Sequence, residues 1–172
     1  MPVLHVCPLS RLKETVAAIG PSHVVSLLTM GMAIERPASI APDRHLVINV
    51  SDILEPMKGH VLAGPEHIEQ LLAFIRAWDR KSPLLFHCWA GISRSTAAAY
   101  IAACALAPDR DETELALALR EAAPSATPNV RFVALADDLL GRQGRMADAI
   151  RAIGRGAEAM EGTPFMLQIN RG

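Results

Sequence analysis

Short apolar segments alternate with longer segments of helical periodicity, and this alternation most limits the folds open to the chain. The apolar segments are four to eight residues long, which suits buried strands, and stretches long enough for helices separate most of them. The predicted strands are LHVC (4–7), HVVSLLTM (23–30), HLVINV (45–50) and LLFHC (84–88). This order predicts an α/β domain with a central, mostly parallel sheet of about four to five strands flanked by helices.

Sequence signals at their ends mark several of the predicted helices. Ser10 can cap the first helix and Gly20 can end it, while Pro65 suits the first turn of the second. The segment RSTAAAYIAACALA has almost no polar face, so we expect a central, buried helix there. The predicted helices are 10–20, 65–81, 94–107, 111–123 and one or two helices within 129–155. No repeat or linker interrupts the sequence, so we expect a single domain over residues 1–172.

Composition and charge exclude several classes of function. Hydrophobic residues make up 51% of the 172 residues and charged residues 20%, which is enough apolar material for a core. The net charge is −1, so we expect no general attraction to nucleic acid or to an anionic membrane. A local anion site is compatible with this balance. The excess of arginine (14) over lysine (3) is typical of a bacterial protein.

The cysteines favour a reducing compartment. Cys7, Cys88 and Cys104 form no CxxC pair, so a zinc ribbon or a disulfide scaffold is not supported. The start of the sequence lacks the basic and apolar regions of a secretory signal, and the apolar run 96–107 is too short to span a bilayer. We therefore expect a cytoplasmic protein, with Cys7 and Cys104 simply buried.

The segment FHCWAGISRST (86–96) joins the fourth strand to the buried helix and has the features of an anion site. A helix N-terminus leaves amides without partners, and Gly91 permits a backbone in which several amides converge. Arg94 adds a planar fork that fits phosphate oxygens. The same field stabilises a thiolate at Cys88, and the thiolate is the nucleophilic form of cysteine. Ser95 can donate a hydrogen bond to the sulfur when it later becomes the leaving group.

The same segment resembles the signature of the cysteine-dependent protein tyrosine phosphatases, HC followed by five residues and then R with S or T. The matching positions are His87, Cys88, Gly91, Ser93, Arg94 and Ser95. SATPNVRF (125–132) is similar to a motif of the compact, dual-specificity branch through Pro128, Asn129 and Phe132. The resemblance to this branch covers roughly 47–140 and implies its phosphatase fold. The expected phosphate-binding residues are Trp89, Ala90, Gly91, Ile92, Ser93 and Arg94, with His87 and Asn129 in supporting positions.

The leaving oxygen of a phosphate ester needs a proton, which this family supplies from an aspartate upstream of the nucleophile. Asp52 follows the strand at 45–50, so parallel strands would bring it to the same edge of the sheet as Cys88. The other acids weighed for this role are Asp43, Glu55, Glu66, Glu69 and Asp79. We choose Asp52, with Asp43 as a distant second.

The predicted reaction has two steps and uses no cofactor or metal. The Cys88 thiolate attacks phosphorus while Asp52 protonates the departing oxygen, and water then hydrolyses the phosphocysteine with Asp52 as base. Arg94 and the loop amides hold the equatorial oxygens throughout. The leading substrate is a protein phosphotyrosine or a dual-specificity protein site, and a small phosphate ester is the runner-up. The loop contains no lysine, which disfavours a highly charged inositol phosphate.

Two other functions remain open at this point. A rhodanese-like sulfurtransferase also places a cysteine in an anion-binding loop, and a phosphate-binding module without turnover would need the cradle alone. His60 and His67 lack the further ligand that a metal site needs. The arginines of GRQGRMADAIRAIGRG (141–156) read as a solvated helix face, with an anionic partner as the minority interpretation.

Overall fold

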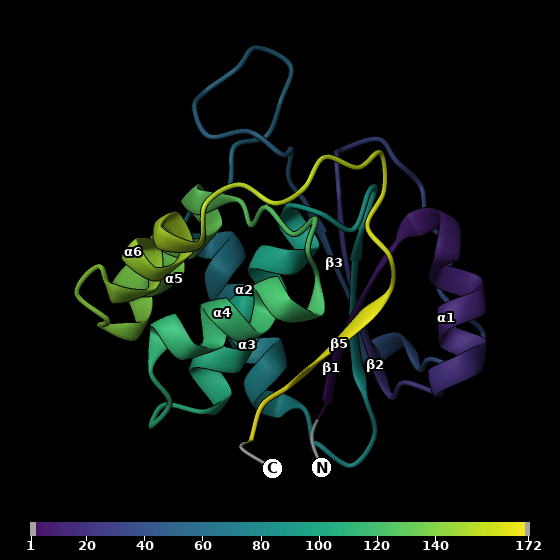
Figure 1. Ribbon diagram of the computed structural model, residues 1–172. Coiled ribbons are helices and arrows are strands. Elements are labelled where there is room, and N and C mark those ends of the chain that lie inside the picture. Colours follow the sequence, from purple (N-terminus) through teal and green to yellow (C-terminus); the bar gives the residue numbers. More distant parts are fainter. Residues whose placement is uncertain (1–2, 171–172) are drawn as a thin grey trace.

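The computed structural model describes residues 3–170, and its centre is a five-stranded sheet in the order β3-β2-β4-β1-β5 (Figure 1). The strands are β1 (Val3–Pro8), β2 (His23–Leu28), β3 (His45–Asn49), β4 (Leu84–Cys88) and β5 (Phe165–Gln168). The first four are parallel, and β5 runs antiparallel to β1 at the edge. The predicted α/β class and mostly parallel sheet are confirmed.

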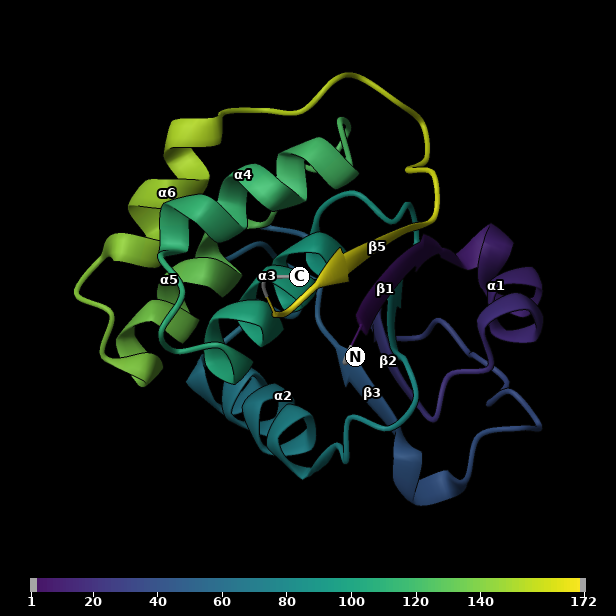
Figure 2. The same ribbon diagram turned by 60° about the horizontal axis from the view of Figure 1, so that its bottom comes forward.

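Helices cover both faces of the sheet, unequally (Figure 2). One face carries α1 alone, and the other carries the remaining five. The helices are α1 (Leu12–Ile19), α2 (Pro65–Ala77), α3 (Arg94–Leu106), α4 (Glu112–Ala122), α5 (Val130–Leu140) and α6 (Arg145–Ile153), with 3-10 turns at Leu9–Arg11 and Pro42–Arg44. Among the described residues, no helix is both long and apolar enough to cross a membrane.

Helix α3 is the centre of the larger layer. All its residues from Arg94 to Cys104 are buried, as its lack of a polar face predicts. It packs against β4 and β1 on one side and against α2, α4 and α5 on the other. The helix that begins at the end of β4 is therefore enclosed on all sides, which holds its first turn rigidly.

The parallel register brings the carboxyl ends of the strands together. β2 pairs in parallel with both β3 and β4, so the carboxyl ends of these strands lie side by side. Three residues lie at or just beyond these ends: Thr29, Asp52 and Cys88. Loops at these ends are where open α/β sheets place their ligands. Asp43 instead lies just before β3, at the amino-terminal end of the parallel strands. This position, at the other end of the strand from Cys88, removes it as an alternative to Asp52.

The structure differs from the sequence prediction at both ends of the chain. Helix α1 begins at Leu12, and Ser10 does not cap it but donates to Glu161 Oε2 at 2.9 Å. The prediction was wrong because residues 9–11 form a 3-10 turn, whose first amide bonds Trp89. The edge strand β5 was not predicted, since its four residues are too few to show a clear alternation.

Helix α6 depends on a carboxylate supplied by α5. Its N-cap, Gly144, has no side chain, and Asp137 caps it instead. The Asp137 carboxylate is buried and accepts from Gly144 N (2.6 Å), Met146 N (2.7 Å) and Ala147 N (3.3 Å). A distant aspartate therefore satisfies the amides that a helix start leaves open.

Replacing this aspartate tests the cap. We expect Asp137→Ala to lower the free energy of unfolding by about 2–3 kcal/mol, because three amides at the helix start, two of them buried, lose their acceptor. Urea unfolding followed by circular dichroism measures the change. The matched control is the exposed neighbour Asp138→Ala, which should stay within about 0.5 kcal/mol of the wild type. Equal losses in both variants would contradict the cap.

Candidate active site

Cys88 and Arg94 bound a tight loop between β4 and α3, which we call the 88–94 loop. Cys88 is the last residue of β4 and Arg94 the first of α3. The Cys88 side chain is only 2% exposed, and its sulfur lies 3.0 Å from Ser95 Oγ. The expected contact between the cysteine and this hydroxyl is therefore present, at the second residue of the helix.

Four carbonyls of the 88–94 loop accept hydrogen bonds from amides of three other segments of the chain. The pairs, with the donor amide first, are Leu9–Trp89 (3.1 Å), Gly162–Ala90 (2.8 Å), Thr127–Ile92 (2.9 Å) and Asn129–Ser93 (3.2 Å). In a trans peptide the C=O of one residue and the N–H of the next point in opposite directions. Four outward carbonyls therefore turn four amides toward the interior of the loop, where they form a cradle for an anion.

Gly91 makes this tight path possible. Its φ is +68°, and a Cβ there would lie 2.7 Å from Pro8 N and 2.9 Å from Cys7 C. Gly162 is equally confined, since its Cβ would meet the Gly91 carbonyl oxygen at 2.6 Å. The loop is thus pressed between the end of β1 and the segment before β5, and both approaches need glycine.

Arg94 is buried with one edge of its guanidinium held and the other unpaired. Nη1 donates to the Val50 carbonyl at 2.9 Å and to Thr29 Oγ1 at 3.2 Å. Nε is buried and has no partner among the described residues. A buried guanidinium N–H without a hydrogen-bond acceptor costs free energy. Arg94 therefore offers a fixed donor edge that a phosphate can occupy.

The structure brings Asp52 to the 88–94 loop. Asp52 Oδ1 accepts from Ser93 Oγ at 2.7 Å and from Asn129 Nδ2 at 2.8 Å. Asn129 also caps α5, because its Oδ1 accepts from the amides of Arg131 (3.0 Å) and Phe132 (3.2 Å). Three residues singled out in the sequence thus meet through side-chain hydrogen bonds, and the cap fixes the orientation of the amide that positions Asp52.

His87 lies beneath the loop, inside the sheet. It is fully buried, and its Nε2 lies 2.5 Å from Ser26 Oγ, which in turn lies 2.8 Å from His45 Nε2. Burial lowers the pKa of His87 to about 4, so the ring is neutral near pH 7. This chain of contacts ties β4 to β2 and β3 at the residue before Cys88.

The other two cysteines have a different environment. Burial raises the pKa of Cys7 to about 11 and that of Cys104 to about 12. Both thiols therefore stay protonated near neutral pH, as expected for buried structural cysteines. Within residues 3–170, no group of three or more His, Cys, Asp or Glu side chains is arranged to hold a metal ion.

Several residues that build the site carry no recognisable signal in the sequence. Thr29 and the Val50 carbonyl orient Arg94, and Gly162 bonds the loop from a segment that sequence analysis left unassigned. Only the strand order, which places Thr29 and Val50 at the same edge as Cys88, points to the first two. Gly162 has no local pattern at all.

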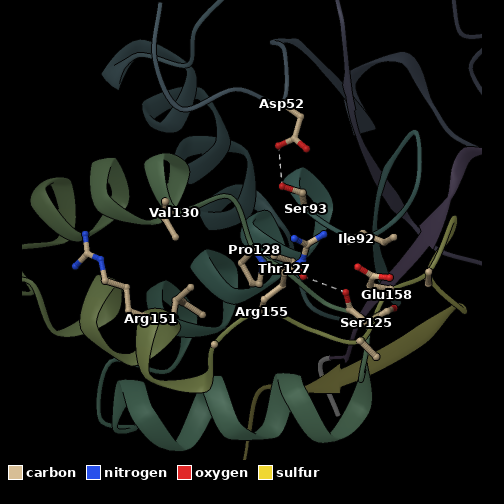
Figure 3. A pocket seen from close by; sticks show the side chains of 14 residues that line it. Asp52, Ile92, Ser93, Ser125, Thr127, Pro128, Val130, Arg151, Arg155 and Glu158 are labelled. Atoms are coloured by element: carbon tan, nitrogen blue, oxygen red, sulfur yellow. Dashed lines mark hydrogen bonds between the residues drawn. The ribbon is translucent and has the colours of Figure 1, made fainter.

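A cavity of about 520 Å³ opens beside the 88–94 loop (Figure 3). Ile92, Ser93 and Asp52 form one wall, and the 125–130 segment and residues 150–159 form the others. Its volume falls within the range of small-ligand pockets. Trp89 does not line it; this residue is 60% exposed and lies beside Leu9, Ser10 and Glu161.

Comparisons with solved structures identify the fold that carries this site. The structure is similar to that of DUSP15 (20% identity, TM-score 0.64, covering 88% of this chain and 92% of that one) and of human DUSP28 (20%, 0.60, 81% and 94%). It is also similar to the human tyrosine phosphatase-like serine/threonine/tyrosine-interacting protein (17%, 0.63, 83% and 94%). No family model matches the sequence, and no curated protein sequence does either. The chain therefore has the fold of the dual-specificity and protein tyrosine phosphatases, as the sequence resemblance predicts.

The close contact at Gly91 gives a first test of the loop. We expect Gly91→Ala to destabilise the protein by more than 3 kcal/mol, because the new methyl group meets backbone atoms that cannot move aside. The matched control is Gly31→Ala, where φ is +88° but no atom lies within 4 Å of the new Cβ. That variant should be destabilised by only about 1 kcal/mol, because the backbone strain at positive φ is its only cost. Thermal unfolding of both variants distinguishes a close approach from left-handed strain alone.

The buried His87 predicts a pH dependence of stability. The unfolded chain binds a proton at about pH 6.5 and the folded one only at about pH 4, so stability falls as the pH falls through this interval. Protonation of His87 should lower the free energy of unfolding by about 3 kcal/mol over this interval. Urea titrations of His87→Gln, which can keep the Ser26 contact, should show a flatter pH profile. The exposed His60→Gln is the control, and a wild-type profile in His87→Gln would contradict the assignment.

Proposed function

We propose that this protein hydrolyses phosphate monoesters through a phosphocysteine intermediate on Cys88. The carrying observation is the buried, unpaired Nε of Arg94, the residue that ends the loop whose carbonyls are bonded from outside. A buried cation edge and converging amides suit a dianion with three equatorial oxygens. The fold shared with dual-specificity phosphatases supports the same conclusion.

The first step transfers the phosphoryl group to the enzyme. The Cys88 thiolate attacks phosphorus, an S–P bond forms, and the bond from phosphorus to the leaving oxygen breaks. Asp52 gives its proton to that oxygen. Its Oδ1 accepts from Ser93 and Asn129, which leaves Oδ2 as the oxygen that carries the proton. Arg94 and the loop amides balance the charge of the equatorial oxygens throughout.

The second step returns the enzyme to its starting state. Water attacks phosphorus, the S–P bond breaks, and the Asp52 carboxylate takes the proton from the water as the bond forms. Sulfur leaves as a thiolate, and Ser95 Oγ, 3.0 Å away, stabilises it by donating a hydrogen bond. Cys88, Asp52 and Ser95 thus supply the nucleophile, the proton and the hydrogen bond to sulfur, and the proposed chemistry uses no cofactor.

The substrate in this proposal is a phosphorylated protein, with phosphotyrosine as the leading site and dual specificity as the wider option. The exposed Trp89 and the open cavity beside the loop favour a substrate larger than a small phosphate ester. The fold comparisons do not favour a sulfurtransferase. A binding module without turnover keeps the same cradle, so activity itself must decide against it.

Hydrolysis of p-nitrophenyl phosphate tests the proposal directly. We expect metal-independent turnover at mildly acidic pH that survives a chelator, is inhibited by vanadate and is abolished in Cys88→Ser. Asp52→Asn should lose about 10²- to 10⁴-fold in kcat on phosphotyrosine peptides and less on p-nitrophenyl phosphate, whose leaving group needs little protonation.

Asp43→Asn is the matched control for the acid, because Asp43 lies at the amino-terminal end of the parallel strands. It should retain wild-type turnover. No turnover by folded, reduced wild-type protein would overturn the proposal, and vanadate binding by that inactive protein would then identify a binding module. Turnover in Cys88→Ser would exclude the phosphocysteine.

A further inference from the structure

We infer that Arg155 binds a carboxylate side chain close to the phosphorylated residue of the substrate, so that the enzyme prefers acidic phosphopeptides. This inference rests on the proposed function and adds a specificity determinant to it. It starts from the cavity beside the 88–94 loop, where Arg155 lies among Ile92, Thr127 and Pro128 (Figure 3).

The backbone around Arg155 is fixed on both sides. Arg120 Nη2 donates to the Gly154 carbonyl at 2.7 Å, and Gly156 N donates to Thr127 Oγ1 at 3.1 Å. A Cβ on Gly156 would lie 2.6 Å from the Ala126 carbonyl oxygen, so the segment is pressed flat against the loop that precedes α5. The start of the Arg155 side chain therefore has one position relative to the catalytic loop.

Arg155 is an exposed residue of the cavity lining, and its guanidinium is unpaired within residues 3–170. It makes no hydrogen bond or ion pair with any residue in the described part of the chain. Its neighbour Arg151 differs on both counts, because it is paired with Asp148 at 3.3 Å and its side chain points out of the cavity (Figure 3). Only one of the two arginines is thus directed at a bound substrate.

Ser93 of the 88–94 loop and Asp52 line this cavity. The carboxylate that Arg155 binds can therefore belong to the same substrate as the phosphate. A phosphate held in the 88–94 loop lies next to these residues, so a neighbouring side chain of the same peptide enters the cavity. Asp52 and Glu158 are the acidic side chains of the lining. Asp52 carries a proton in the proposed first step, so Glu158 is the group that opposes an anion there. An arginine fork fits a carboxylate with two parallel hydrogen bonds.

The test compares phosphotyrosine peptides that differ only in one neighbouring residue, aspartate or alanine, scanned over the three positions on each side. At the preferred position, wild-type kcat/KM should be about 3- to 10-fold higher for the aspartate peptide. The measured quantity is this ratio, which cancels any common effect on folding or chemistry. Arg155→Ala should bring it close to one, Arg155→Lys should keep part of it, and Glu158→Gln should raise it.

Arg151→Ala is the matched control and should keep the wild-type ratio, because a general electrostatic effect would respond equally to both arginines. A preference that survives Arg155→Ala, a ratio of one in the wild type at every position, or an equal loss in Arg151→Ala would each overturn the inference. Turnover of p-nitrophenyl phosphate by the wild type separates this failure from failure of the proposed function, which predicts that turnover whatever the peptide preference.

Discussion

The outward bonding of the 88–94 loop carbonyls is the constraint on which the site depends. Their partners are amides at Leu9, Thr127, Asn129 and Gly162, from segments far apart in the sequence. Each bonded carbonyl turns the next amide inward, so the anion cradle is a property of the whole fold. Arg94 is also oriented by distant residues, because its Nη1 donates to Thr29 and Val50, which follow β2 and β3. The sheet brings all these groups to one edge.

Local patterns singled out the residues to which we assign the chemistry, while contacts over long sequence distances were missed. The strand–loop–helix order led to Cys88 and Arg94, and the end of a parallel strand led to Asp52. Asn129 was singled out by resemblance, but its bond to Asp52 became visible only in three dimensions. Gly162 left no signal, because its importance lies in what packs against it. The edge strand β5 was too short to show a period.

The fold by itself does not decide the chemistry. One of the similar structures is described as phosphatase-like and interacting, although it shares the architecture of the phosphatases. What distinguishes an enzyme is a small set of side chains: a cysteine beside a hydroxyl, a half-paired arginine and an acid held at the rim. Cys7 and Cys104 lie outside this set of side chains, and burial raises the pKa of both thiols.

The bond from Gly162 to Ala90 also sets an order of events during synthesis. Cys88 and helix α3 are translated long before the segment that completes the 88–94 loop. At 5–20 residues per second, the roughly 70 residues between Arg94 and Gly162 take about 4 to 14 s to add. During that interval the Ala90 carbonyl lacks its final partner. On the ribosome, the nascent chain therefore carries its cysteine before it has a finished binding site.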